Sequence, residues 1–134
     1  MYGKLAKGEN KVIFLGQIDD DELKAYLLAM DIFCFPSIQK NEAFGIALAE
    51  AMYFGKAAVT FNIPGSGVNY VNLNGETGIE VDNGDYKDYA DALFFFQSNR
   101  EQLIQMGISA KDRVKRLFSY EQYKKNIREL LKSI

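Results

Sequence analysis

The sequence contains no histidine and a single cysteine among its 134 residues. Without histidine, the chain can build neither a Ser-His-Asp nor a Cys-His nucleophile system, and it can hold no histidine-ligated metal. The lone cysteine, Cys34, excludes an intrachain disulfide and a cysteine metal cluster. Because Cys34 lies between Phe33 and Phe35, we expect a buried small hydrophobic residue in a reducing compartment rather than a nucleophile.

Strong net charge and long apolar runs are also lacking. The formal net charge is −2 and the pI is near 5.2, which leaves no basic surface for nucleic acid or an anionic membrane. No apolar run approaches the ~18 residues of a membrane span, and no signal-peptide pattern precedes the expected fold. We therefore expect a cytoplasmic protein that holds any anionic ligand through backbone amides or single side chains.

The chain does contain enough apolar sequence for one core. Its 48% hydrophobic and 25% charged residues are typical of a globular protein, and its mass of 15.2 kDa corresponds to a single domain over residues 1–134. Residues 1–10 are polar and contain glycine, so we expect them to form a leader segment.

The hydrophobic period switches repeatedly between that of strands and that of helices. Short apolar runs predict strands at residues 12–16, 31–37, 57–61 and 77–81. Helical spacing predicts helices at residues 19–31 and 44–54 and three more beyond residue 85, of which the last spans 119–134. Strands that alternate with helices favour an α/β, Rossmann-like fold in which a mostly parallel sheet carries helices on both faces.

Capping signals mark several of these helices. Asp19 or Asp20 is the expected N-cap of the first helix, and Gly55 is the expected left-handed cap that ends the second. Ser119 and Gln122 have the spacing of a capping box at the start of the last helix. The apolar residues of that last helix form one stripe: Tyr120, Tyr123, Ile127, Leu130, Leu131 and Ile134.

In parallel sheets of this kind, ligands bind outside the carboxyl ends of the strands. Three loops follow predicted strands, with the sequences GQIDD, PSIQKNEAFG and NIPGSGV. A helix that begins near Phe44 would direct its first amides toward this edge, where they suit a phosphate or sugar hydroxyls. Gly45 would let a ligand approach that backbone; the alternative is a loop residue with a special dihedral angle.

Two glutamates, Glu42 and Glu50, flank this glycine with seven residues between them. A rise of ~1.5 Å per residue would place them about 12 Å apart on one helix. Glycosidase carboxylate pairs stand about 5 to 9.5 Å apart, so this pair is a poor acid and base for a single bond. The glutamates are better placed to hold two ends of an elongated ligand, although two exposed charges remain the alternative.

An ordered set of motifs extends from about Lys11 to the end of the chain. A strand ending in glycine is followed by P-S, by E-x-F-G with a second glutamate, by E-A-M-x-x-G, by a glycine-rich loop and T-G, and by FSYEQY. This set resembles the carboxy-terminal, nucleotide-sugar-binding domain of family 4 retaining glycosyltransferases. These are GT-B enzymes with two facing Rossmann-like domains.

The resemblance implies roles for individual residues. It places Glu42 beside the donor sugar as the catalytic residue and Glu50 on the ribose of the nucleotide. The other implied donor contacts lie in the loops and at the helix start: Gly16, Gln17, Ile18, Phe44, Gly45, Ile46, Gly65 and Ser66.

The resemblance also implies a reaction. A hexosyl group would pass with retention from a nucleotide sugar, UDP-linked in preference to GDP- or ADP-linked, to an acceptor hydroxyl in glycan biosynthesis. The acceptor would be a glycan or lipid-linked, and neither a metal nor another cofactor is expected. The full-length protein would be cytoplasmic, with peripheral association at the inner face of the membrane as an option.

The expected catalytic arginine and lysine of the family are not found here, because they belong to the first βα unit, which would lie upstream of Met1. The amino-terminal acceptor domain would lie there too. We therefore expect a truncated donor-binding domain that is inactive alone. In the usual strand order, the missing strands lie between the run at Val12 and the one at Ile32, so the remaining strands should pair across the gap or the chain should form a homodimer.

Other functions remain as alternatives. At IPGSGVNYV, Ser66 and Asn69 stand near where the family more commonly has paired glycines followed by glutamate, which weakens the donor contact expected from this loop. A non-catalytic, flavodoxin-like nucleotide-binding or interaction module is one alternative. A related GT-B enzyme, either a phosphorylase or an epimerase, is another, and the lack of histidine counts against the epimerase.

Overall fold

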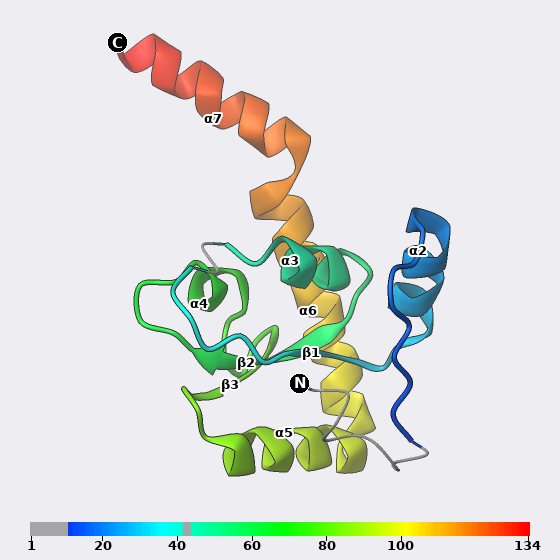
Figure 1. Ribbon diagram of the computed structural model, residues 1–134. Coiled ribbons are helices and arrows are strands. Elements are labelled where there is room, and N and C mark those ends of the chain that lie inside the picture. Colours follow the sequence, from blue (N-terminus) through cyan, green and yellow to red (C-terminus); the bar gives the residue numbers. More distant parts are fainter. Residues whose placement is uncertain (1–10, 42–43) are drawn as a thin grey trace.

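The computed structural model describes residues 11–41 and 44–134 (Figure 1). The predicted leader at residues 1–10 lies outside them. The elements in chain order are α2 (Asp20–Ala29), β1 (Ile32–Phe35), α3 (Ile46–Tyr53), β2 (Ala57–Asn62), α4 (Val68–Val71), β3 (Gly78–Asp82), α5 (Tyr86–Ser98), α6 (Arg100–Phe118) and α7 (Tyr120–Ser133). Strands alternate with helices up to α5, which confirms the predicted α/β architecture.

The three strands form one parallel sheet in the order β1-β2-β3. Ile32 of β1 pairs with Ala57, and Ala58 of β2 pairs with Gly78 at the start of β3. The first five residues of β2 are buried, as a central strand with packed layers on both faces requires. β1 and β3 are the edges of this sheet.

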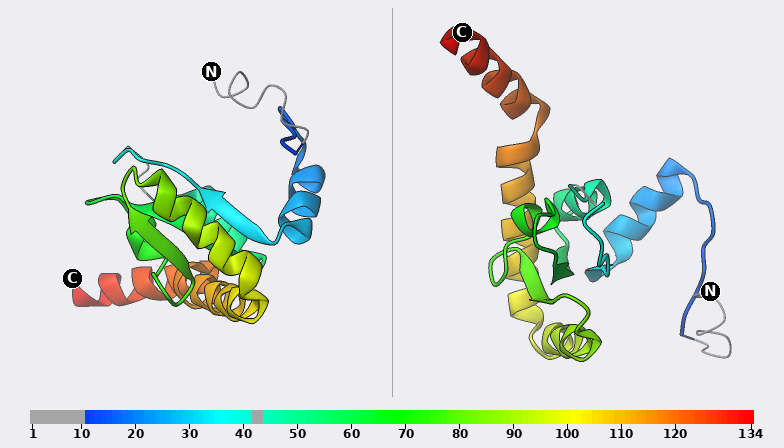
Figure 2. Two further views of the ribbon diagram at one scale, coloured as in Figure 1. Left: turned by 90° about the horizontal axis from the view of Figure 1, so that it is seen from below. Right: turned by 60° about the vertical axis from the view of Figure 1, so that its left-hand side comes forward.

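Helices cover both faces of the sheet (Figures 1 and 2), as predicted. Alternate residues of β2 enter two separate cores. Val59 and Phe61 pack with Phe96 of α5 and the first half of α6. Ala58 packs on the opposite face with α3, α4 and the second half of α6, where Ala110 is fully buried. The long helix α6 therefore contributes to both cores and ties the two layers together.

A buried polar network joins the central strand to the start of β3. The amide of Asn72 donates to Thr60 Oγ1 at 3.0 Å, and the Thr77 hydroxyl donates to Asn72 Oδ1 at 2.8 Å. All three side chains are fully buried. Gly78 lies directly against this network, since a Cβ there would stand 2.1 Å from the carbonyl oxygen of Ala58.

The predicted strand at residues 12–16 is wrong. Val12, Ile13, Phe14 and Leu15 are 42–79% exposed, and the segment joins no sheet within the part of the chain that the structure describes. An apolar run forms a strand only where a neighbouring strand pairs its backbone groups, and no described strand lies beside it. The expectation that the run at Val12 pairs directly with the strand at Ile32 is therefore also wrong. The sheet begins at β1.

Three further expectations need correction. Cys34 was expected to be buried, but it is exposed because β1 is an edge strand. The second helix begins at Ile46 rather than Phe44. The glycine-rich turn after β2 continues into a short helix, α4, that was not predicted.

The last helix confirms its predicted stripe. Ser119 is the N-cap of α7, and its hydroxyl accepts a hydrogen bond from the Gln122 amide at 3.2 Å. No residue of α7 is buried, and the stripe residues are 39–93% exposed. α7 extends away from the sheet beyond the end of α6 (Figure 2). None of the described helices is both long enough and apolar enough to cross a membrane.

Candidate functional site

The loops that leave the carboxyl ends of the strands converge. Asn83, just after β3, donates from its side-chain amide to the carbonyl of Ile38 in the loop after β1, at 3.2 Å. Gly45, at the end of that same loop, approaches α4, which follows β2: a Cβ at Gly45 would lie 3.5 Å from the Val68 side chain. The structure therefore brings three loops together at the edge where parallel sheets bind ligands.

Gly45 is the N-cap of α3 and has a positive φ of 79°. Its role as a loop residue with a special dihedral angle, the alternative raised from the sequence, is thus confirmed. This turn places the first amides of α3, which have no intrahelical acceptor, at the carboxyl edge of the sheet. Ile46, the first residue of the helix, is 70% exposed, and the Phe44 ring lies edge-on against Phe118 with ring centroids 5.1 Å apart.

Gly65 and Ser66 shape the loop between β2 and α4. Gly65 has a φ of 81°, and the Ser66 hydroxyl accepts from the Val68 amide at 3.2 Å. Asn69 reaches back into the same loop, where its Oδ1 accepts from the Ile63 amide at 3.1 Å. Ser66 and Asn69, which depart from the family pattern, therefore help to build the loop.

Arg113 of α6 holds the end of α4, and it was not singled out from the sequence. Its side chain is 7% exposed, and its guanidinium donates to the carbonyl oxygens of Tyr70 and Val71 at the end of α4. It also lies over the Tyr70 ring, 5.2 Å from the centroid. These contacts link α4 to α6 across more than forty residues of sequence, so no local sequence pattern could predict them.

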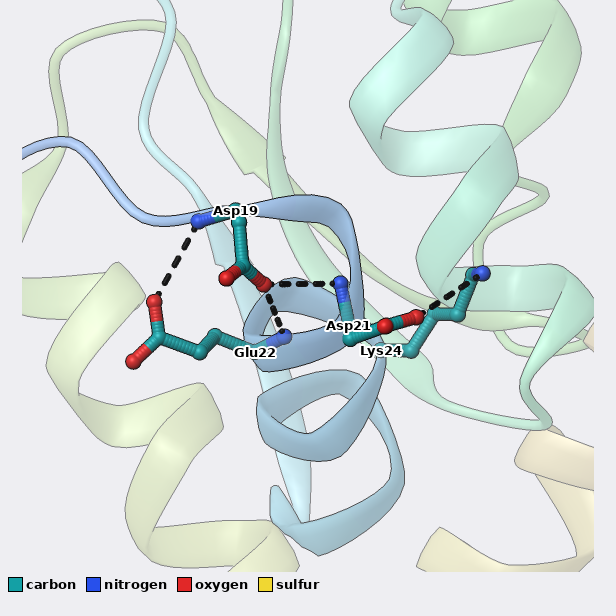
Figure 3. A network of polar contacts seen from close by, with 4 residues as sticks. All are labelled: Asp19, Asp21, Glu22 and Lys24. Atoms are coloured by element: carbon teal, nitrogen blue, oxygen red, sulfur yellow. Dashed lines mark hydrogen bonds and ion pairs between the residues drawn. The ribbon is translucent and has the colours of Figure 1, made fainter.

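Gly16, Gln17 and Ile18 lie in the segment that leads into α2, where Gly16 and Gln17 are exposed, Ile18 is half-buried and the φ of Gly16 is 66°. The helix then starts at a full capping box (Figure 3). The Asp19 carboxylate accepts from the amides of Asp21 and Glu22 at 3.0 and 2.9 Å, and Glu22 accepts from the Asp19 amide at 3.3 Å. Asp19 is therefore the N-cap, one of the two predicted candidates.

A cavity of about 240 Å³ lies between α2 and α3. We refer to it as the α2–α3 cavity, and its lining residues are Asp20, Leu23, Lys24, Leu27, Glu50 and Phe54. Glu50 thus faces the helix that follows the Gly16–Ile18 segment, as the predicted nucleotide site requires. α2 contributes four of the six lining residues, and none of the four was predicted to contact the donor.

Glu42 lies outside the described residues, so its position relative to Glu50 and its catalytic role stay predictions. Of the other predicted site residues, Glu50, Phe44 and Ile46 are solvent-exposed on or beside α3. Gly65 and Ser66 adjoin α4, which packs beside the start of α3.

Two other cavities lie at the opposite edge of the sheet. One, of about 500 Å³, surrounds the turn between α5 and α6; the other, of about 310 Å³, lies beside Gly55 and Lys56. Both are lined by Arg100, which pairs at 2.7 Å with Asp31 just before β1. Ligands of parallel α/β sheets bind at the carboxyl ends of strands, so we assign the site to the α2–α3 side despite its smaller cavity.

The only cysteine is not placed for nucleophilic chemistry. Although Cys34 lies exposed on an edge strand, neighbouring atoms shield its thiol from part of the solvent and raise its pKa, and a hydrogen bond with Tyr89 opposes this effect more weakly. Burial also raises the pKa of the Tyr89 hydroxyl, which donates to the Val59 carbonyl at 2.8 Å. The thiol therefore stays protonated near neutral pH. Within residues 11–41 and 44–134, no three Cys, Asp or Glu side chains gather as metal ligands would.

Residues 4–113 match the family model of glycosyl transferases group 1. D-rhamnosyltransferase WbpZ of Pseudomonas aeruginosa is 35% identical over 114 residues, which are 85% of this chain and 30% of the relative. Alpha-1,3/1,6-mannosyltransferase ALG2 of Dictyostelium discoideum is 32% identical over 126 residues, 94% of this chain and 29% of the relative. The chain thus spans less than a third of these proteins.

Solved structures share its fold over nearly its whole length. Sucrose-phosphate synthase from Thermosynechococcus elongatus superposes with a TM-score of 0.81 at 25% identity, over 99% of this chain and 33% of that one. Anabaena HepE, solved in complex with UDP-glucose, superposes with a TM-score of 0.82 at 22% identity, over 98% of this chain and 35% of that one.

Proposed function

The chain belongs to the glycosyl transferases group 1 family, and from this premise we propose that it is the donor-binding part of a retaining hexosyltransferase. Its substrate would be a nucleotide sugar, and the reaction would pass the sugar to an acceptor hydroxyl in glycan biosynthesis. The flavodoxin-like module is not favoured, because the family match covers most of the chain.

One observation carries this proposal: the α2–α3 cavity joins Glu50 to the helix that follows Gly16–Ile18. The Glu50 carboxylate would accept from the ribose hydroxyls, with the base beside the first turn of α2. The diphosphate would lie toward the start of α3, where the first amides and the positive end of the helix dipole favour negative charge.

The chemistry that these groups support is departure of the nucleoside diphosphate. Negative charge grows on the leaving phosphate in the transition state, and pre-oriented amide donors stabilise it without reorganising. Glu42 would lie by the donor sugar. Group 1 glycosyl transferases are generally metal-independent, so we propose that no metal takes part; an unchanged donor affinity in EDTA would agree, and a loss would contradict it.

The chain spans about 30% of the length of its relatives, so we propose that the acceptor, a glycan or a lipid-linked molecule, binds a part of the enzyme not included here. The present chain would bind the donor weakly and would not catalyse transfer. A uridine nucleotide was the expectation from sequence, and the UDP-glucose complex of HepE supports it as one candidate.

Exposed apolar surface suggests how the chain associates with others. Val12–Leu15, the free edge of β1 and the stripe of α7 have no covering layer among the described residues. We propose that the isolated chain self-associates through them and that the whole enzyme works in the cytoplasm, with peripheral membrane contact as an option. Light scattering that shows a monomer at high concentration would contradict the self-association.

Titration of the chain with nucleoside diphosphates tests the donor site. Glu50→Gln should weaken binding about tenfold or more, because a hydrogen bond to a charged group contributes ~1.5–3 kcal/mol. Glu76→Gln changes another exposed glutamate, in the turn before β3; it is the matched control and should leave affinity unchanged. Equal affinity in all three proteins, or no binding to the unsubstituted chain, would refute the proposal.

A further inference from the structure

The turn that leads into α3 is not fastened by the helix itself. Gly45, the N-cap, has no side chain that could accept from the first amides of α3. In many helices the residue before the N-cap packs against the fourth helical residue, and this contact sets the angle at which the chain enters the helix. Here those two residues are Phe44 and Ala49, and an alanine methyl group offers little surface to a phenylalanine ring.

Phe118, the last residue of α6, supplies a contact in its place. Its ring meets the Phe44 ring edge to face, with centroids 5.1 Å apart and planes at 89°. Phe118 is half-buried and packs on the core cluster that contains Leu48 and Met52, whereas Phe44 lies at the surface. The ring anchored in the core is therefore Phe118, and the ring that it holds is Phe44.

Phe118 is itself held from the side of α4. Its ring lies 5.9 Å from the Tyr70 ring, centroid to centroid, at an angle of 71°. Arg113 lies over the other partner of this pair, 5.2 Å from the Tyr70 centroid, and donates to the backbone carbonyls at the end of α4. We refer to Phe44, Tyr70, Arg113 and Phe118 as the Phe118 cluster. It braces the loop after β1 and the helix after β2 against α6.

This brace acts at the turn that the proposed function assigns to the diphosphate. Gly45 has a φ of 79°, and a glycine backbone can leave such a conformation readily because it has no Cβ. The carbonyl of Gly45 accepts from the Ala49 amide at 3.0 Å, so rotation in the turn would open the first turn of α3. Amide donors stabilise an anion best when they are already oriented, because binding then has no ordering cost.

We propose that Phe118 is a positioning residue for the donor site: its ring holds Phe44 and thereby keeps the first amides of α3 in the orientation that receives the diphosphate. Phe118 does not touch the ligand and acts through Phe44. This inference rests on the proposed function, since it places the diphosphate at the start of α3.

Calorimetric titration tests the effect on donor affinity, with whichever of UDP, GDP and ADP binds the unsubstituted chain most tightly. Phe118→Leu keeps an apolar side chain but removes the ring, and affinity should fall about two- to tenfold, as the loss of one edge-to-face contact implies. The matched control is Phe33→Leu. Phe33 is also half-buried on the same core cluster, but its ring contact is with Phe35. It should lower the unfolding midpoint similarly and leave affinity unchanged.

A double-mutant cycle shows whether Phe118 acts through Phe44. Phe44→Leu leaves the backbone amide in place and removes the ring that Phe118 holds. If the two rings work as one contact, Phe118→Leu should have no further effect on affinity in the Phe44→Leu background. Additive losses of affinity would show that the two side chains act independently and would overturn the proposal.

Amide exchange of the ligand-free chain gives a readout that needs no binding. The Ala49 amide closes the first turn of α3 on Gly45, so its exchange should quicken about two- to tenfold in Phe118→Leu, relative to amides within α6. Phe33→Leu should not change this ratio. A general loss of stability would quicken exchange in α3 and α6 alike.

The outcomes separate this inference from the proposed function. If the unsubstituted chain binds a diphosphate and Phe118→Leu changes neither its affinity nor Ala49 exchange, the positioning role is overturned and the donor site stands. The same holds if Phe33→Leu weakens binding as much as Phe118→Leu. If no diphosphate binds the unsubstituted chain, both proposals fail together.

Discussion

β2 buries five of its six residues, whereas α2 buries one of its ten. β2 has a strand on each side, helices over both faces and a polar network in which every member is paired. Leu27 is the one buried residue of α2, the carbonyl of Leu28 accepts from the Lys56 ammonium at 2.9 Å, and the Val12–Leu15 segment before the helix is exposed. α7, at the other end of the chain, buries none of its residues.

This difference separates the part of the molecule that stabilises the fold from the part that we propose binds the ligand. The core around β2 needs nothing beyond the described chain to satisfy its polar groups, since no buried side-chain N or O within the described residues lacks a partner. The α2–α3 cavity lies on the boundary, with α3 anchored in the core by Leu48 and Met52 and α2 loosely attached. A ligand between them would hold α2 in place, so binding energy and order are coupled there.

The largest loss of stability is expected from substitution of Gly78, where β3 packs most tightly against β2. Gly78→Ala would put a Cβ 2.1 Å from the Ala58 carbonyl oxygen and 2.7 Å from Asn72 Oδ1. The cost should reach or exceed the upper end of the ~1–3 kcal/mol usual for overpacking, seen as a lower denaturation midpoint or loss of the cooperative transition. Gly84→Ala, with a φ of 83° but open space around it, is the control and should cost only ~1–2 kcal/mol.

Removing the amide of Asn72 should have the next largest effect. Asn72→Ala removes the amide that donates to the fully buried Thr60 hydroxyl, at ~1–3 kcal/mol for an unsatisfied group, while the Thr77 hydroxyl loses one partner and still accepts from the Leu73 amide. Asn74→Ala removes an exposed bond to the Glu80 amide and should cost less. Chemical denaturation compares the two, and equal losses would mean that the buried network is not what holds β2 and β3 together.

A smaller and local loss of stability is expected in α2, at the periphery of the fold. Asp19→Ala removes the N-cap of α2, which typically contributes ~0.5–2 kcal/mol to a helix. Because α2 is barely packed, amide exchange within Asp20–Ala29 should quicken while the global unfolding midpoint hardly moves. Asp21→Ala in the same turn should leave exchange nearly unchanged. A large global loss for Asp19→Ala would show that α2 belongs to the core.

The smallest effect is expected in α7. Leu131, 65% exposed, can be replaced by alanine with a change within ~0.5 kcal/mol in the unfolding free energy of the chain. Leu103→Ala in α6, where the side chain is 5% exposed, is the matched substitution and should cost ~2–5 kcal/mol. The small change at Leu131 is expected in dilute solution, where the chain is a monomer. At high protein concentration Leu131→Ala should also lower the stability gained from the proposed self-association, and an equal effect at both concentrations would contradict a role of the stripe in it.

The parts of the fold that the sequence predicted are those governed by local rules. Asp19 caps α2, Gly55 takes its left-handed conformation, and the three strands that pair lie within the apolar runs. The strand predicted at residues 12–16 did not form because a strand needs a neighbouring strand to pair with, and the sequence of the run cannot specify that neighbour. The burial predicted for Cys34 was wrong for a related reason, since the sequence does not show that β1 is an edge strand.

The candidate site was predictable only in part. Gly45 and Glu50 were singled out because they stand in an ordered set of motifs; the structure places Gly45 at the start of α3 and Glu50 in the lining of the α2–α3 cavity, and their contacts with a donor stay predictions. The contributions of Lys24 and Arg113 depend on contacts between segments far apart in the chain, such as the 42-residue separation between Arg113 and Val71. No spacing rule reports such contacts.

Hydrogen exchange of the chain with and without nucleoside diphosphate tests most directly the claim that the donor lies between α2 and α3. We predict slower exchange in residues 16–29 and 44–54 when the nucleoside diphosphate is added, with the larger change in α2 because it is less protected beforehand. Residues 98–105, at the cavity on the amino edge, should not change. Protection confined to residues 98–105, or none in α2, would contradict the account.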